Sequence, residues 1–166
     1  EVDFMEQVEN YFIVKPLNEG AGKNEIQKNL DSVGEGDIVF CVYFGQGRGY
    51  FIKVKEKANM VPLLAADEPE ELQVLGVAQL HTAVFKTILK IDTKQPDSQK
   101  YVTYKVDMLE ALTRVDSGEF DLAFFMNATR ISEVRNLAEK GIRLPQKATF
   151  FYPKLLSGLV INKFES

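Results

Sequence analysis

The sequence is poor in residues that carry much of protein chemistry, because it has one cysteine, one histidine and no tryptophan. A single cysteine, Cys41, excludes a disulfide within the chain, and such usage is typical of a reducing compartment. We therefore expect a cytoplasmic protein. One histidine, His81, beside one cysteine also argues against a zinc site or a Ser-His-Asp triad built by this chain alone. We predict no metal site and leave the cofactor unassigned.

Long apolar runs are missing as well. No stretch approaches the about 18 consecutive apolar residues that span a bilayer. The first residues lack the basic region and apolar stretch of a secretory signal. We therefore expect no membrane association.

Positive charge is not in excess, because the chain has 20 Lys and Arg and 24 Asp and Glu, which gives a net charge of −4. This balance argues against a nucleic-acid partner. The charge is uneven, because residues 141–166 hold four basic and one acidic side chain (+3) and the remainder carries −7. A basic end on an acidic body favours a local anion site or a charge-complementary contact inside a larger protein. Ordinary fluctuation over so short a stretch explains it equally well.

What the chain does have is enough apolar material for a core. It has 166 residues, of which 45% are hydrophobic, with twelve Phe and six Tyr. These numbers predict one domain over residues 1–166. We expect residues 1–65 to form a portion with two helices and a hairpin, and residues 70–166 to form an α/β portion. The predicted class is α+β, with one central mixed sheet, a β-hairpin and packed helices.

The first part of the chain predicts four elements. Apolar residues at helical spacing predict a short helix over the first dozen residues, which runs into a strand at 12–14. A polar helix is expected at 24–33. Residues Ile38 to Val54 predict a β-hairpin, with Gly45 to Gly49 as a five-residue connection. Helical character is expected from Glu70 to about Ile91.

The last third predicts strands at 101–105, 121–126 and 159–164, and helices at 107–115 and 130–140. Asp107 and Glu110 can form a capping box for the first of these helices. Thr129 is the expected N-cap of the second, and Gly141 its end. The inward-facing residues are expected to be these: Leu109, Leu112 and Val115 in the first helix, and Ile131, Val134, Leu137 and Ala138 in the second.

Two glycine-containing runs invite a phosphate-loop interpretation, which the spacing excludes. Gly20 to Lys23 lacks both the upstream glycine and the following Ser or Thr of a P-loop. Gly45, Gly47 and Gly49 open a strand, whereas a dinucleotide fingerprint opens a helix. We interpret the second run as the turn of the β-hairpin.

His81 and Cys41 are better explained as structural residues than as catalytic ones. His81 shares a helical face with apolar residues, so we expect it to be buried or nearly so, with one ring nitrogen satisfied and no metal nearby. Its titration range leaves a functional role open. Cys41 lies in an apolar run without an adjacent cation to lower its pKa, which argues against a nucleophile.

The strongest candidate site lies in the run from Leu144 to Lys154, where three aromatic residues stand between two lysines and two prolines. The prolines favour a stiff extended path. Lysines could meet an anion, and an amide and hydroxyls could add directional hydrogen bonds. The alternative is a buried aromatic turn whose lysines reach solvent. The predicted anion-binding residues are Gln146, Lys147, Thr149, Tyr152 and Lys154.

The run from Leu144 to Ile161 resembles the C-terminal signature of a family of uncharacterised conserved bacterial and archaeal proteins, often labelled as related to the chromosome-partitioning ParB proteins. Phe124 to Thr129, Tyr104 to Asp107 and Leu80-His81 occur in the order that the family shows. The likeness is specific from about Tyr101 onward. Family members are more than twice this length and carry a Gly-His-His-Arg-Tyr run in their N-terminal half, which is absent here.

The resemblance implies that this chain is the C-terminal part of a longer protein. The chain departs from the family pattern at Ala128, Leu144 and Ala148, and the last departure removes a hydroxyl from the expected anion site. The superfamily of the ParB label includes free-serine kinases, and family genes often lie beside those of serine biosynthesis. The resemblance therefore implies an accessory domain of a phosphate-handling enzyme of serine metabolism.

The partners expected on this basis are the N-terminal half of the same protein and a phosphorylated small molecule, with catalysis carried mainly by that other half. The alternative is a non-catalytic interaction domain, whose aromatic segment packs on the N-terminal half or on a second subunit of a homo-oligomer.

Overall fold

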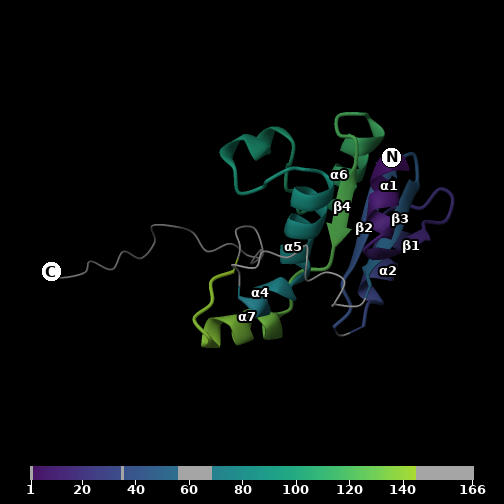
Figure 1. Cartoon of the computed structure of the whole chain (residues 1–166). Helices are drawn as coiled ribbons and strands as arrows, with labels where there is room; N and C mark the ends of the chain where they lie inside the picture. The colour runs from purple at the N-terminus through teal and green to yellow at the C-terminus, as the bar shows by residue number, and fades with distance from the viewer. Residues whose placement is uncertain (1, 35, 56–68, 145–166) are drawn as a thin grey trace, which may run out of the picture.

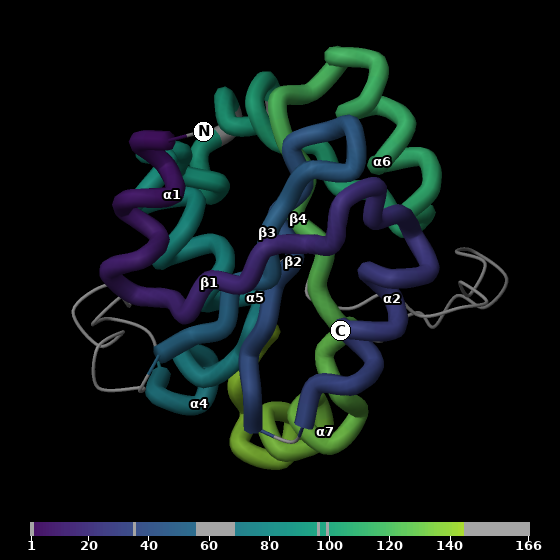
Figure 2. The backbone as a smooth tube through the Cα atoms, turned by 90° about the vertical axis from the view of Figure 1, so that its right-hand side faces the viewer, coloured from purple at the N-terminus to yellow at the C-terminus, as the bar shows by residue number. Residues whose placement is uncertain are grey.

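The computed structural model describes residues 2–34, 36–55 and 69–144, and in it a four-stranded sheet lies between two layers of helices (Figures 1 and 2). The α+β class predicted from the sequence is confirmed. The elements, in chain order, are α1 (Val2–Glu9), β1 (Phe12–Pro16), α2 (Lys23–Asp31), β2 (Val39–Gly45), β3 (Arg48–Val54), α4 (Glu70–Gln73), α5 (Gly76–Gln79), the π-helix η2 (Leu80–Ile88), the 3₁₀-helix η3 (Pro96–Lys100), α6 (Met108–Asp116), β4 (Ala123–Met126) and α7 (Ile131–Glu139).

The strands are arranged in the order β1-β3-β2-β4. Each neighbouring pair is antiparallel, with Val14 opposite Ile52, Phe40 opposite Ile52, and Cys41 opposite Phe125. We predicted a mixed sheet, and no parallel pair occurs among the described strands. The expected strand at 159–164 lies outside the described residues.

Strand β2 is the centre of the molecule because both of its faces are buried. Phe40 and Val42 point to one face, where α1 and η2 pack over them. Cys41 and Tyr43 point to the other, which α2 and α6 cover. Figure 2 shows the sheet between these layers, with α1 and α5 on one side and α2 and α6 on the other. The continuous apolar run of β2 is the pattern expected of a strand covered on both sides.

The predicted hairpin is confirmed, but its connection is shorter than expected. Only Gln46 and Gly47 separate β2 from β3. Gly45, Gln46 and Gly47 all have positive φ. The carboxylate Oδ1 of Asp116, at the end of α6, accepts hydrogen bonds from the Tyr43 hydroxyl at 2.8 Å and from the Gln46 amide at 2.7 Å. The end of α6 therefore holds the tip of the hairpin.

Gly49 provides a test of how tightly β2 and β3 approach. A Cβ at this position would lie 2.4 Å from the carbonyl oxygen of Val42, which is backbone and cannot move aside alone. We expect Gly49→Ala to lower the free energy of unfolding by about 2 to 3 kcal/mol, the cost of overpacking. Urea unfolding measures this effect. Gly34→Ala is the control, because its nearest contact would be an ordinary 3.8 Å; equal losses in both variants would contradict the explanation.

The strand predicted at 101–105 is wrong, since these residues pair with no described strand. Tyr104 instead stacks on His81, with ring centroids 5.9 Å apart and planes 9° apart. Lys105 forms an ion pair with Glu110 of α6. The segment therefore contacts η2 and α6, and no described strand pairs with it.

The helix predicted at 70–91 is interrupted. Val74 and Leu75 separate α4 from α5, and Leu75 has an extended ψ of 136°. The chain then continues from α5 into the π-helix. The amide of Leu89 donates to the carbonyl of Val84, five residues earlier, as a π-helix requires. Helical character was predicted correctly, whereas the break and the wider helix were not.

Helix α6 begins at the predicted residue, but only two of its three predicted inward-facing residues are buried. Asp107 Oδ1 accepts from the amides of Leu109 and Glu110, which confirms the N-cap. The Glu110 carboxylate forms ion pairs with Lys105 and Arg114 instead of accepting the backbone amide of Asp107, so the predicted capping box is not complete. Leu112 and Val115 are buried, but Leu109 is 57% exposed, contrary to the prediction.

Helix α7 also differs at its start. Its N-cap is Arg130, one residue after the predicted Thr129. Leu137 is buried, while Ile131 is 82% exposed and Ala138 is exposed. Because Leu137 is the one buried residue of α7, this helix contacts the rest of the domain over a small area. The apolar pattern of its sequence therefore predicted more buried residues than the structure has. Gly141 ends the helix with positive φ, as predicted.

Candidate functional site

The anion site predicted from the sequence lies outside the described residues. This applies to each of its members: Gln146, Lys147, Thr149, Tyr152 and Lys154. Their convergence on one polar spot, and the alternative of a buried aromatic turn, both stay predictions.

His81 is half-buried, where we predicted a residue that is buried or nearly so. Its Nδ1 and the Thr93 hydroxyl are hydrogen-bonded at 2.7 Å. Its ring packs edge-on against Phe85 and flat against Tyr104. The described residues contain no group of three or more His, Cys, Asp or Glu side chains that could hold a metal ion. The contacts assign His81 a structural role between η2 and the segment that follows it.

Cys41 is completely buried in β2. Burial, with a smaller effect from the negative charge of Glu25, raises the pKa of its thiol from 9.0 to about 12. The thiolate is the nucleophilic form, so this position disfavours nucleophilic chemistry at neutral pH.

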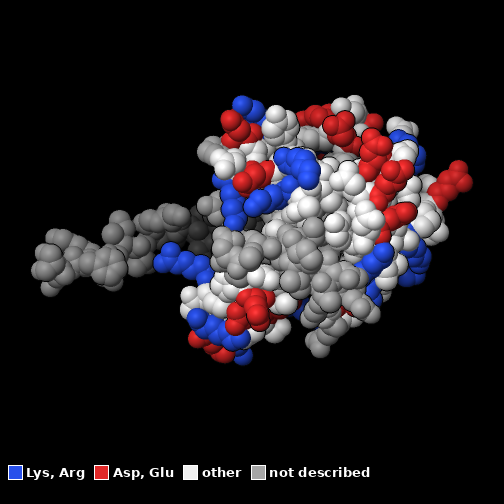
Figure 3. Space-filling view, viewed as in Figure 1, with Lys and Arg blue, Asp and Glu red and all other residues white. Residues whose placement is uncertain are grey.

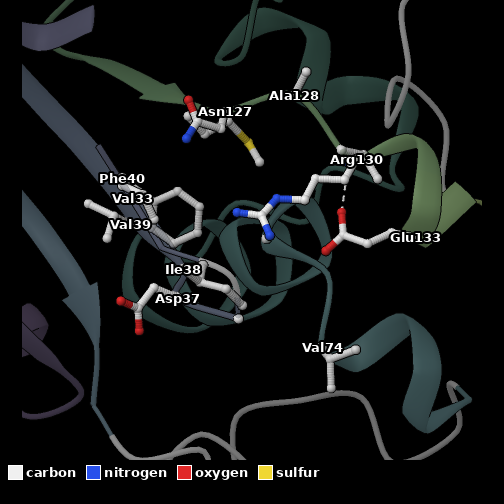
Figure 4. A pocket seen from close by; sticks show the side chains of 14 residues that line it. Val33, Asp37, Ile38, Val39, Phe40, Val74, Asn127, Ala128, Arg130 and Glu133 are labelled. Carbon is white, nitrogen blue, oxygen red and sulfur yellow. Dashed lines mark hydrogen bonds between the residues drawn. The ribbon is translucent and has the colours of Figure 1, made fainter. Parts of the chain in front are cut away.

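The described residues do form a pocket at the end of the sheet where β2 begins and β4 ends. It holds about 180 Å³. Its wall on one side comes from the loop after α2, and on the other from the loop between β4 and α7, with α4 and α5 below (Figure 4). The lining residues are Val33, Gly36, Asp37, Ile38, Val39, Phe40, Val74, Gly76, Met126, Asn127, Ala128, Thr129, Arg130 and Glu133.

Two long-range hydrogen bonds hold the walls together. The Asn127 side-chain amide donates to the carbonyl of Leu30, in the last turn of α2, at 2.6 Å. The Arg130 guanidinium donates to the carbonyl of Gly34 at 3.2 Å. Each bond joins residues more than ninety positions apart. The pocket is therefore built by tertiary contacts. The same two hydrogen bonds orient the side chains of Asn127 and Arg130.

The charged groups of the pocket have distinct surroundings. Glu133 Oε2 accepts the backbone amide of Arg130 at 2.8 Å, which is half of a capping box. Asp37 is paired with Lys53 at 2.8 Å. The Arg130 guanidinium extends into the pocket toward the first residues of β2 (Figure 4). Its hydrogen bond to the backbone carbonyl of Gly34 orients the guanidinium.

This arrangement can hold an anion. The planar guanidinium presents several N–H donors in a fork that matches a carboxylate or a phosphate. Asn127, whose amide also donates to the carbonyl of Leu30, and Thr129 lie on the same lining. Sequence reasoning missed this site, because it used residues 127–130 for the family resemblance and as the approach to a helix, and not as a binding site. The available signal was a run of polar residues directly after a buried strand.

A second hollow lies on α7 alone and is lined by Ile131, Ser132, Arg135, Asn136 and Glu139. These residues are successive positions of one helix surface, so no second element closes around a ligand there. Figure 3 shows that Asp and Glu gather over α1 and α6 on the face that it presents. The pocket beside Arg130 is the stronger candidate, since several elements build it.

Comparison with known proteins found no match: no family model, no curated protein and no solved structure corresponds to this chain. The resemblance to the ParB-related family therefore stays a prediction. Within the described part of the chain, no helix is long and apolar enough to cross a membrane.

Proposed function

We propose that this chain is a binding domain that holds a small anion-bearing molecule in the pocket beside Arg130. One observation carries the proposal: a guanidinium, oriented by a backbone carbonyl, extends into a pocket whose walls are joined by long-range hydrogen bonds. A phosphate or a carboxylate on a small molecule meets this chemistry best.

The wider biological role proposed here follows the sequence resemblance. In it, the chain is a cytoplasmic accessory domain of a phosphate-handling enzyme of serine metabolism, and the N-terminal half of a longer protein carries the catalysis. The Arg130 pocket supports the anion-binding part of this proposal, by a different set of residues from those of the 144–154 segment.

Replacement of Arg130 tests the proposal. Titration of the full chain with phosphoserine, inorganic phosphate and acetate, followed by calorimetry, should detect binding of at least one anion. Arg130→Ala should weaken that binding at least about tenfold, because a charge-assisted hydrogen bond contributes about 1.5–3 kcal/mol. Arg130→Lys should retain part of it, since the charge remains while the fork is lost. Added salt should weaken binding to the native chain.

Arg135→Ala is the matched control, because Arg135 is an exposed arginine on the outer surface of α7. It should leave the affinity unchanged. An equal loss in both alanine variants would point to general surface charge and contradict the proposal. So would the absence of binding of all three anions at millimolar concentrations.

The second candidate is an interaction domain, and one observation favours it. Four large apolar side chains in a nine-residue stretch are exposed, between 45% and 73%: Tyr101, Tyr104, Val106 and Leu109. Such a concentration of exposed apolar surface is typical of a contact with another protein.

A further inference from the structure

An apolar patch lies away from the Arg130 pocket, where the chain runs from η3 into α6. It consists of the exposed side chains of Tyr101, Tyr104, Val106 and Leu109. They are four of the eight large hydrophobic residues that are exposed within residues 2–34, 36–55 and 69–144, although they occupy only nine consecutive positions. Figures 1 and 2 show α6 at one end of the molecule and α7, which borders the pocket, at the other. The patch is therefore a separate surface.

Contacts on the inner side hold the patch in position. The Tyr104 ring lies flat against the His81 ring, with centroids 5.9 Å apart and planes 9° apart. Val102, between the two tyrosines, packs on the core under α1 and η2. Asp107 caps the helix that carries the last residue of the patch. Because these contacts already order the segment, a partner that binds the patch loses less free energy in ordering it.

Charged residues of opposite sign flank the patch. Lys100 directly precedes it and Glu110 directly follows it, and both are exposed. Within the chain, Lys100 is paired with Asp97, and Glu110 with Lys105 and Arg114. Ion pairs at an exposed surface contribute little, so these groups can also meet charges of a partner. A surface that is apolar in the middle, positive at one end and negative at the other is complementary to a copy of itself turned by 180°.

We propose that the apolar patch is the interface between two copies of this chain, related by a two-fold axis. The two patches lie against each other in opposite directions, and Lys100 of each copy meets Glu110 of the other. This inference goes beyond anion binding at Arg130. It rests on the second candidate, the interaction domain, and names the partner of that domain.

The size of the patch predicts a weak dimer. Its four side chains expose on the order of 400 Å² of apolar surface. A stable complex of standard size buries about 800 Å² on each partner, so the charged rim must supply the remainder. We therefore expect dimers at protein concentrations on the order of 100 µM.

Sedimentation velocity of the full chain over a concentration series tests the inference. The native chain should change from monomer to dimer between about 10 µM and about 500 µM. Val106→Glu should keep it monomeric, because the substitution places like charges in the apolar centre of the contact. Ile131→Glu is the matched control, since Ile131 is 82% exposed on α7 and lies outside the patch. This variant should dimerise as the native chain does.

A mixing experiment shows whether the partner is a second copy in the proposed orientation. Lys100→Glu and Glu110→Lys each place like charges at both ends of the two-fold contact, so each variant alone should dimerise at least about fivefold more weakly. In an equimolar mixture every end contact joins opposite charges again, and a heterodimer should form. Circular dichroism establishes that each variant is folded.

The outcomes distinguish this inference from the proposed function. A native chain that stays monomeric up to about 500 µM would overturn the inference, while anion binding at Arg130 is measured independently by calorimetry. Dimers that persist in Val106→Glu, or that are lost equally in Ile131→Glu, would place the interface elsewhere. A mixture that associates no better than its components would contradict the two-fold arrangement.

Discussion

Replacement of Phe40 by Ala is expected to lower the free energy of unfolding by about 4 kcal/mol, within the range for removal of a buried aromatic ring. Phe40 lies on the central strand β2 and is 0% exposed. Its ring meets that of Phe12 edge-on, with centroids 6.3 Å apart, inside the core cluster under α1 and η2. The substitution removes these contacts and leaves a cavity that the surrounding helices and strands fill only in part.

Equilibrium unfolding in urea measures this change as a lower midpoint at an unchanged slope. Leu109→Ala is the control, because Leu109 is 57% exposed on α6 and should change stability by no more than about 0.5 kcal/mol. A loss below about 1 kcal/mol for Phe40→Ala would show that β2 is not the centre of the core.

The second large effect is expected at alkaline pH and comes from Cys41, on the opposite face of the same strand. Burial raises the pKa of its thiol from 9.0 in the unfolded chain to about 12 in the folded protein. Above pH 9 the unfolded chain releases this proton, while the folded protein keeps it until about pH 12. The contribution of Cys41 to the free energy of unfolding is therefore fully present below pH 9 and is lost as the pH rises from 9 to about 12. The total loss is about 4 kcal/mol, since each pKa unit corresponds to about 1.4 kcal/mol.

The measurement is the free energy of unfolding from pH 8 to pH 12, compared between the native chain and Cys41→Ala. The variant is less stable at pH 8 because it leaves a small cavity, and its stability should decline less steeply above pH 9. Burial also raises the pKa of Tyr43; this effect of burial is common to both proteins, whereas the smallest cause of the Tyr43 shift, the charge of Cys41, is absent from the variant. Parallel curves for the two proteins would show that the Cys41 thiol ionises in the folded state as it does in the unfolded chain.

Together these two substitutions examine both faces of one strand. Phe40 reports on the layer formed by α1 and η2, and Cys41 on the layer formed by α2 and α6. Phe40 also lies beneath the Arg130 pocket, so the stability of the core and the shape of the candidate site depend on the same side chain.

The sequence by itself determined the elements whose signals are local. Asp107 predicted the start of α6, Gly141 the end of α7, and the β-branched and aromatic runs the hairpin of β2 and β3. These signals work because caps, positive φ angles and side-chain periodicity depend on residues within a few positions of one another. The α+β class followed from the number and order of such elements.

Tertiary structure alone decided the strand order, the contacts of residues 101–105 and the candidate site. Whether residues 101–105 join a sheet depends on a free strand edge nearby, and their own pattern carries no information about that. The pocket is assembled from three separate stretches of chain, and hydrogen bonds from Asn127 to Leu30 and from Arg130 to Gly34 hold it. Because those partners are more than ninety residues apart, no local rule could place Asn127 and Arg130 beside the end of α2 and the loop that follows it.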